Sequence, residues 1–245
     1  MAGCTFPGKP LVEGTASLDN FDIVAKLLDV DPLEAYMHSG RVLAEHIMGF
    51  DPPKKKKPKI LALHASHYRK SNTLELWNLV KKHLDNCEIT EISLRNGTIL
   101  DCIGCPYKTC RYFGESASCI YGGVIVDQVY PTIIDCDALV MICPNYNDAI
   151  SANLAAFINR LTALLKYSKF YNKYLFSLIV SGYSGSDIVA QQLISGLNMN
   201  KTFILPSRFA MMETANSPGS VLKLEGIEMR VKDFAENIMN HICGE

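Results

Sequence analysis

The chain reads Lys59-Ile-Leu-Ala-Leu-His-Ala-Ser-His-Tyr-Arg-Lys-Ser-Asn-Thr73 and continues as Leu-Glu-Leu-Trp-Asn-Leu-Val80, and this stretch decides the fold. A short apolar run, Ile60 to Leu63, is typical of a strand covered on both faces. A polar loop follows, and then helical spacing begins, with Ser71 or Asn72 as a suitable N-cap. Such a helix start binds anions, because its free N–H groups and positive dipole end face the same point. A loop of Ser, Thr and Asn suits one terminal phosphate, although an ordinary capped helix would have the same pattern.

Composition and missing motifs exclude several classes of function. Neither G-x-G-x-x-G nor G-x-x-x-x-G-K-[ST] occurs, which disfavours a Rossmann dinucleotide fingerprint and a triphosphate cradle. The 245 residues have a net charge of -1, which gives no case for nucleic-acid binding. No apolar run approaches membrane-spanning length, and the N-terminus lacks the apolar core of a signal peptide. We therefore expect a cytoplasmic protein with neither a nucleic-acid nor a membrane partner.

Strand and helix patterns alternate from residue 59 onward. The expected strands are 59–65, 88–94, 137–143, 173–181 and 201–207. The expected helices are 72–86, 123–135, 150–165, 186–198 and 225–242. Repeated strand-then-helix units predict an α/β fold with a flavodoxin-like, doubly wound, five-stranded parallel sheet of order 2-1-3-4-5. Ligands of such sheets bind beyond the carboxyl ends of the strands.

The first 57 residues form a separate part in this interpretation. We expect residues 1–57 to be an N-terminal helical extension with a basic linker, and residues 58–245 to be the main domain. The clearest helix start is Asp31-Pro-Leu-Glu34, with an N-cap and proline at the first helical position, and Gly49 is its expected stop. Two short amphipathic helices cannot bury their own apolar faces. They should therefore pack on the main domain or on a second subunit.

Two further loops follow strands and carry a family resemblance. They are Cys143-Pro-Asn-Tyr-Asn-Asp-Ala-Ile-Ser151 and Ser181-Gly-Tyr-Ser-Gly-Ser186. The loop after the first strand is similar to the Gly-Ser-Pro-Arg-Lys-x-Ser-Asn-Thr loop of the NADPH-dependent FMN reductase family. The segment after Cys143 resembles that family's Ser-Pro-x-Tyr…Leu-Lys-x-Phe-Ile-Asp-Arg pattern. The resemblance covers about residues 58 to 210, with four departures: Ala65 replaces Gly, His67 replaces Pro, Tyr68 replaces Arg and Ala155 replaces Lys.

The resemblance implies that the main domain binds FMN. It assigns the phosphate and ribityl chain to Ser66, Tyr68, Arg69, Ser71, Asn72 and Thr73. It places the flavin ring against Pro144, Asn145, Tyr146 and Asn147, with the opposite side closed by Ser181, Gly182, Tyr183 and Gly185. A rigid turn can aim backbone N–H groups at the ring, and a glycine-bearing loop permits close approach. Arg160, on the helix that follows, is expected to form an ion pair on the helix surface.

Four of the nine cysteines fall in one loop, residues 102–119, with the spacing C-x2-C-x4-C-x8-C. Cys102, Cys105, Cys110 and Cys119 could hold a [4Fe–4S] cluster or a zinc ion, or they could remain free or redox-active thiols. The run resembles the iron–sulfur flavoprotein branch of the same family. That branch has shorter gaps before its third and fourth cysteines.

The resemblance implies an FMN-dependent NAD(P)H oxidoreductase that passes electrons to a small acceptor, such as a flavin or quinone, or to an iron–sulfur cluster. The flavin would carry the chemistry, so we expect no catalytic side chain. Members of the family form homodimers or homotetramers, and the same is expected here. Two alternatives stay open: a non-enzymatic, flavodoxin-type electron carrier between protein partners, and a zinc-stabilised interaction module without flavin.

Overall fold

A five-stranded parallel sheet forms the centre of the computed structural model, which describes residues 22–51, 53–66, 71–95, 99–165 and 167–244. The strand order is β2-β1-β3-β4-β5, so the predicted flavodoxin-like fold is confirmed. The strands are β1 (Lys59–His64), β2 (Glu88–Ser93), β3 (Ala138–Pro144), β4 (Tyr174–Ser181) and β5 (Ala210–Thr214). All four pairings are parallel, and their carboxyl ends lie at one edge of the sheet.

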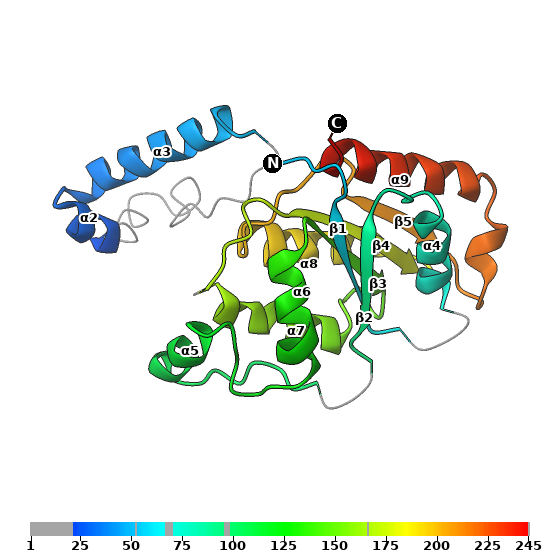
Figure 1. Ribbon diagram of the computed structural model, residues 1–245, viewed down its shortest axis with the longest axis horizontal. Helices are drawn as coiled ribbons and strands as arrows, with labels where there is room; N and C mark the ends of the chain where they lie inside the picture. The colour runs from blue at the N-terminus through cyan, green and yellow to red at the C-terminus, as the bar shows by residue number, and fades with distance from the viewer. Residues whose placement is uncertain (1–21, 52, 67–70, 96–98, 166, 245) are drawn as a thin grey trace.

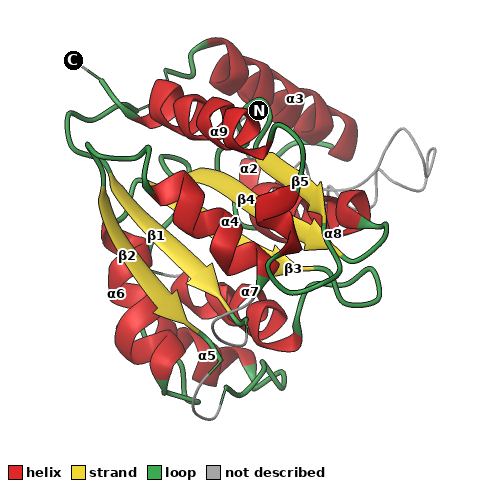
Figure 2. Ribbon diagram, turned by 90° about the vertical axis from the view of Figure 1, so that its right-hand side faces the viewer, coloured by secondary structure: helices red, strands yellow, loops and turns green. Residues whose placement is uncertain are grey.

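Helices cover both faces of the sheet (Figures 1 and 2). One face is covered by α4 (Asn72–Lys81) and α9 (Ile227–Ile242), and the other by α6 (Tyr130–Asp135), α7 (Ala152–Leu164) and α8 (Ser186–Leu193). The other helices between the strands are α5 (Tyr107–Gly114), the π-helices η2 (Ile125–Val129) and η3 (Ile194–Met199), and the 3-10 helix η4 (Ser220–Lys223).

Strands β3 and β4 are buried along their whole length and β1 from Ile60 onward, which matches their near-continuous apolar sequences. Alternate residues of each strand enter opposite cores because side chains alternate across a strand. Leu61 of β1 packs with Phe157 of α7 in one core, and Ile60 packs with Trp77 of α4 in the other. Because helices pack on both faces of the sheet, the loops at its carboxyl edge are anchored at both ends in a packed core.

The fifth strand was predicted at the wrong place. The apolar run at 201–207 predicted a strand, but the structure has only an isolated bridge there, between Ile204 and Tyr174. Phe203 fills the core from an irregular segment in which Thr202 has a φ of 70°. The strand that pairs with β4 starts nine residues later than expected, at Ala210.

Two helices precede the sheet: α2 (Asp22–Leu28) and α3 (Pro32–Met48). The predicted N-cap of α3 is confirmed, because Asp31 Oδ1 accepts the N–H groups of Leu33 (2.8 Å) and Glu34 (3.0 Å). Figure 1 shows both helices to one side of the sheet, and Leu33 and Met37 are 57% and 50% exposed. None of the helices described here combines the length and the apolar character needed to cross a bilayer.

Candidate functional site

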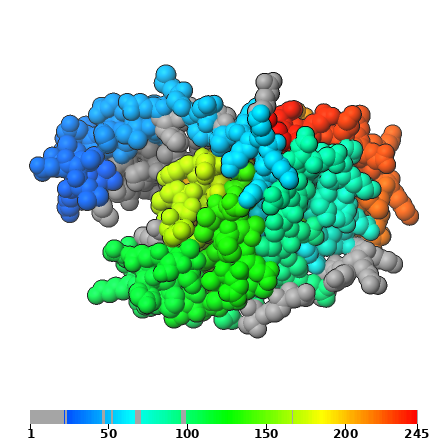
Figure 3. All heavy atoms as spheres, in the orientation of Figure 1, coloured from blue at the N-terminus to red at the C-terminus, as the bar shows by residue number. Residues whose placement is uncertain are grey.

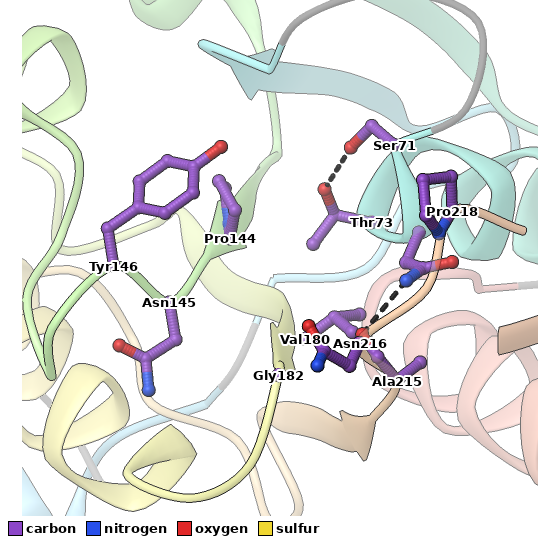
Figure 4. Close-up of a pocket in the computed structure, with 11 residues that line it drawn as sticks. Ser71, Thr73, Pro144, Asn145, Tyr146, Val180, Gly182, Ala215, Asn216 and Pro218 are labelled. Atoms are coloured by element: carbon purple, nitrogen blue, oxygen red, sulfur yellow. Dashed lines mark hydrogen bonds between the residues drawn. The ribbon is translucent and has the colours of Figure 1, made fainter. Parts of the chain in front are cut away.

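A cavity of about 450 Å³ opens at the carboxyl edge of the sheet, where the loops after β1, β3, β4 and β5 meet (Figure 4). Ligands of doubly wound sheets bind at this edge. The residues that line it are Ser71, Asn72, Thr73, Pro144, Asn145, Tyr146, Val180, Gly182, Ala215, Asn216 and Pro218. The cavity therefore brings together residues of the three loops that carry the family resemblance, and adds the loop after β5.

The start of α4 presents a set of hydroxyl groups. Ser71 is the N-cap residue, in an extended conformation, and its side chain makes no capping hydrogen bond. The hydroxyl of Thr73 lies 2.8 Å from that of Ser71 and 3.2 Å from that of the buried Ser66. The first N–H groups of a helix have no partner within it, so an anion could bind there together with these hydroxyls. Tyr68 and Arg69, also assigned to the phosphate from the sequence, lie outside the described residues.

Asn72 has a role that the sequence did not suggest. Its side-chain amide donates to the backbone carbonyls of Ala215 (2.9 Å) and Ser217 (3.0 Å). Its carbonyl oxygen accepts a long hydrogen bond from the N–H of Val221, at 3.4 Å. Asn72 therefore ties the loop after β5 to the start of α4, and its amide is already used within the protein.

The loop after β5 is the part of the cavity that sequence reasoning missed. Ala215, Asn216 and Pro218 line the cavity. The side chain of Asn216 lies against Gly182: a Cβ added at Gly182 would be 3.2 Å from Oδ1 of Asn216. The loop was missed because β5 was expected at 201–207. The turn sequence Asn216-Ser-Pro-Gly219 was the available signal, since only one residue separates it from the end of the true strand.

The loop after β3 forms the opposite wall. The backbone N–H of Asn145 donates to the carbonyl of Val180 (2.9 Å), which continues the pairing of β3 with β4. The chain then reverses at Asn147 and Asp148, whose φ angles are 54° and 57°, and Tyr146 forms a bridge with Ala149. Tyr146 lines the cavity and is 58% exposed. Asn147 is at the tip of this turn and is not among the lining residues.

The side chain of Asn145 joins the loop after β3 to the loop after β4. Its amide lies 3.0 Å from Ser181 Oγ, 2.7 Å from the carbonyl of Ser184 and 3.2 Å from Asp148 Oδ1. Ser181 in turn shares a 2.5 Å hydrogen bond with Ser186 at the start of α8. The two loops are therefore held as one unit.

Gly182 is the residue of the β4 loop that lines the cavity. Gly185 does not line the cavity but packs directly against Asp148 of the loop after β3. Tyr183 is 90% exposed and lies outside the cavity lining. Of the four residues assigned to this side of the flavin, one therefore faces the cavity, two support its walls and one extends into solvent.

The four cysteines of residues 102–119 lie away from the cavity lining, on the side of α7. Side chains of α7 hold the segment that precedes them: Asn153 Nδ2 donates to the carbonyl of Leu94 (2.6 Å), and Asn159 Nδ2 donates to Asp101 Oδ1 (2.9 Å). Arg160 is also used here, so the expectation of a surface ion pair was wrong. It is 3% exposed and donates to the backbone carbonyls of Leu100 and Gly122, on either side of the cysteine segment.

The neighbouring thiols of this loop affect the pKa of Cys110. Burial raises the pKa of the Cys110 thiol, and the neighbouring Cys105, followed by Cys119 and Cys102, raises it further. None of the four forms a disulfide within the described part of the chain. Within the described part of the chain, no three His, Cys, Asp or Glu side chains are grouped closely enough to hold one metal ion.

Comparison with known proteins agrees with this geometry. A family model of NADPH-dependent FMN reductases matches residues 58–217. No curated protein matches the chain significantly. The fold is similar to that of an azoreductase from Bacillus anthracis str. Sterne, at 15% identity and a TM-score of 0.54, over 75% of this chain and 99% of the other. It is also similar to an NAD(P)H:quinone oxidoreductase from Methanothermobacter marburgensis, at 17% identity and a TM-score of 0.55, over 74% and 99%.

Proposed function

The chain belongs to the NADPH-dependent FMN reductase family, whose members are oxidoreductases, and on this premise we propose that it takes electrons from NAD(P)H through FMN and passes them to a small acceptor such as a quinone or a flavin. When bound, FMN would supply the hydride-accepting and electron-donating chemistry. The observation that carries the proposal is the cavity at which the start of α4 meets the Pro144–Tyr146 segment. Its volume is in the range of small-molecule and cofactor sites.

The residues at the start of α4 suit the phosphate of FMN. The Ser71 and Thr73 hydroxyls can rotate to donate to an anion, and the first-turn N–H groups add donors and the positive end of the helix dipole. Ser66 supports Thr73 from within the protein, and Asn72 positions the loop after β5. Tyr68 and Arg69 remain part of the proposed phosphate site.

The walls formed after β3, β4 and β5 suit a flat ring. Pro144, Asn145 and Tyr146 form one wall, and Gly182 and Asn216 belong to the facing loops. Gly182 has no side chain, so a ring can approach its backbone closely. Asn147, Ser181 and Gly185 set the positions of these walls, and we propose that Tyr183, at the exposed rim, contacts the substrate rather than the cofactor.

Titration of the full-length protein with FMN and with riboflavin tests the phosphate site. We expect FMN to bind about 100-fold or more tightly, because two charge-assisted hydrogen bonds contribute about 3 kcal/mol or more in total. Equal affinities would show that α4 does not bind the phosphate. Anaerobic addition of NADH or NADPH should then bleach the flavin absorption. A flavin that binds but is bleached only with a separate reductase would indicate an electron carrier instead.

We also propose that the active form is a homodimer or homotetramer in the cytoplasm, where NAD(P)H and free thiols are present together. Tyr146 lines the cavity, Tyr183 follows the lining residue Gly182, and both side chains are exposed, so a neighbouring subunit could cover the proposed ring face. Light scattering coupled to gel filtration, with and without FMN, measures the oligomeric state. A monomer under both conditions would overturn this part of the proposal.

For the cysteine loop we propose a [4Fe–4S] cluster that exchanges electrons with the flavin. The donor set is chemically suitable, since each iron of such a cluster takes one thiolate. A tetrahedral zinc site is the alternative use of the same four thiolates. Cys102, Cys105, Cys110 and Cys119 would be the ligands.

A further inference from the structure

Three sulfur atoms lie together at the edge of the sheet opposite the cofactor cavity. Met239 is on α9, Cys243 is the residue that ends this helix, and Cys87 directly precedes β2. The Cys87 thiol donates to the thioether sulfur of Met239 at 3.4 Å, and the Cys243 thiol donates to the same sulfur at 3.5 Å. Two segments that are far apart in the sequence therefore place two thiols around one thioether.

The backbone fixes the positions of these residues. The N–H of Cys243 donates to the carbonyl of Met239 (2.8 Å), so the two side chains are one helical turn apart. The N–H of Cys87 donates to the carbonyl of Leu84 (3.0 Å). The three sulfur-bearing side chains are half-buried and pack against the core between the sheet and the helices α4 and α9. The sulfurs are thus held in place without being sealed off from solvent.

The two thiols are protonated and poorly reactive. Burial and, to a smaller extent, the neighbouring Cys243 raise the pKa of the Cys87 thiol to about 12. A thiol must lose its proton to act as a nucleophile, so this pair does not suit rapid thiol–disulfide exchange. A metal ion that binds sulfur strongly can displace thiol protons, and this is the chemistry left to the cluster.

The kinds of donor atom select among metal ions. Soft thiolate and thioether sulfurs select Cu(I), whereas structural zinc sites take four ligands. Among the described residues, no third His, Cys, Asp or Glu side chain joins the two thiols in a group that could hold a metal ion, so zinc is unsuited. Three sulfurs about 2.3 Å from a central ion lie about 4 Å from one another. The two thiols are 3.4 Å and 3.5 Å from the Met239 sulfur, so a small outward movement admits the ion.

A basic segment of the chain lies beside the three sulfurs. Lys55 pairs with Cys243 in an isolated parallel bridge, and a Cβ added at Gly244 would lie 3.1 Å from Cβ of Lys54. Figure 3 shows the segment before β1 next to the end of α9 on the surface. Burial raises the pKa of the Cys243 thiol, whereas Cys87 and the charge of Lys54 oppose that rise. A negatively charged thiolate complex would therefore form next to positive charge.

We propose that Cys87, Met239 and Cys243 form a binding site for one Cu(I) ion. Binding forms two copper–thiolate bonds and a bond to the thioether, and it releases both thiol protons to solvent without the transfer of an electron. One monovalent cation and two thiolates leave a single net negative charge. The ion joins the end of α9 to the start of β2. The site does not depend on the proposed flavin function, because the cofactor cavity lies at the carboxyl edge of the strands.

The experiment follows the methionine methyl groups of the full-length protein by NMR, with carbon-13 in each of these methyl groups. Cu(I) is added anaerobically from its complex with bicinchoninate, whose colour reports how much copper the protein removes. The Met239 signal is assigned from the spectrum of Met239→Leu, and the other methionines are internal references. Because cysteines elsewhere in the chain can also take up copper, a shift of the Met239 signal is the measurement that reports this site.

We expect about one equivalent of Cu(I) to shift the Met239 signal and to raise the melting temperature by about 5 °C. Cys87→Ser and Cys243→Ser should abolish the shift. Met239→Leu conserves side-chain volume and should weaken the binding of about one equivalent of copper by 10-fold or more. The controls are Cys102→Ser, at an exposed thiol of another segment, and Met229→Leu, at a residue of α9 that is 66% exposed. Both should keep the Met239 shift.

Three results would overturn the proposal. An unchanged Met239 signal while the protein removes copper from bicinchoninate would place the metal at other cysteines. Equal shifts in the wild type and in both serine variants would show that the two thiols are not ligands. A disulfide between Cys87 and Cys243 in the anaerobic protein, found by mass spectrometry, would show a different chemistry.

The wild type alone decides if the serine variants do not fold. Bound Cu(I) should protect Cys87 and Cys243 from alkylation by iodoacetamide, because the thiolate sulfurs are then coordinated. Equal alkylation of both residues with and without Cu(I) would exclude the site.

Discussion

Gly185 determines how closely two walls of the cavity approach each other. Its φ of 83° is in the left-handed region, and a Cβ at this position would lie 1.7 Å from Asp148 Oδ1. The sequence predicts a glycine-bearing loop here, but it does not reveal that the glycine packs against the neighbouring loop rather than the flavin. That contact depends on the reversal at Asn147 and Asp148, which is formed by residues far from Gly185 in the chain.

Gly185→Ala should therefore reduce both stability and FMN affinity. The strained φ and the contact with Asp148 predict a loss of about 2–4 kcal/mol in the free energy of unfolding. Gly40→Ala is the matched control, since Gly40 is inside α3 and nothing lies within 4 Å of its added Cβ. The control should gain up to about 1 kcal/mol. Urea unfolding and FMN titration measure both effects, and similar values for the two variants would contradict the packing argument.

The buried His64, at the end of β1, predicts that the free energy of unfolding depends on pH. Burial lowers its pKa below the ordinary value of 6.5, against the opposing charge of Glu91, whose carboxylate lies 3.7 Å from Nε2. Because the folded protein binds this proton more weakly than the unfolded chain, stability is lost as the pH falls below 6.5. His64→Gln should make the fall in unfolding free energy between about pH 7 and 5 shallower. The exposed His83→Gln is the control, and equal slopes in both variants and the wild type would refute the effect.

At the scale of elements, the connection between α4 and the loop after β5 depends on one side chain. Asn72→Ala removes the hydrogen bonds to Ala215 and Ser217, so we expect a loss of about 1–2 kcal/mol in stability. FMN affinity should fall by about tenfold, because the loop that carries Asn216 is no longer fixed. Asn78→Ala is the control on the exposed side of the same helix. If Asn72→Ala binds FMN as tightly as Asn78→Ala does, the loop does not contribute to the site.

Four of the five strands were predicted close to their observed positions, because their apolar runs are bounded by clear turn or helix signals. The fifth strand was predicted at 201–207 instead of Ala210–Thr214 because an apolar run need not be a strand. Phe203 and Ile204 look like strand residues, but they enter the core from an irregular segment, and Arg208, with a φ of 48°, redirects the chain before β5 begins. The true strand, Ala210–Thr214, contains two methionines and a glutamate, a weak strand pattern by propensity.

The site, like the strands, could be predicted only where it depends on local sequence patterns. The hydroxyl-rich start of α4 and the bend after β3 are local patterns and could be found from the sequence. The role of Arg160 could not, because an arginine on a mostly apolar helix reads as a surface residue. Only the tertiary structure shows that the loop carbonyls at Leu100 and Gly122 reach it.

At the scale of the whole molecule, the chain immediately before β1 is joined to the C-terminus. The N–H of Lys55 donates to the carbonyl of Ile242 (2.8 Å), and the N–H of Gly244 donates to the carbonyl of Lys55 (3.0 Å). Lys55 Nζ also pairs with Asp137 Oδ1 at 2.7 Å, although 58% of the lysine side chain is exposed. The basic stretch from Lys54 to Lys57 is thus more than a linker, since Lys55 fixes the end of α9 beside the sheet.

This arrangement predicts where the N-terminal part can be removed. A protein that begins at Asp51 keeps the contacts of Lys55, whereas one that begins at Pro58 loses them. We expect the shorter protein to be less stable by about 1–2 kcal/mol, mainly from its two lost backbone hydrogen bonds, because the exposed ion pair adds little. Both should bind FMN equally, since the cavity lies at the opposite, carboxyl edge of the strands. Urea unfolding and FMN titration of the two proteins check this, and weaker FMN binding by both than by the full chain would mean that residues 1–50 contribute to the site.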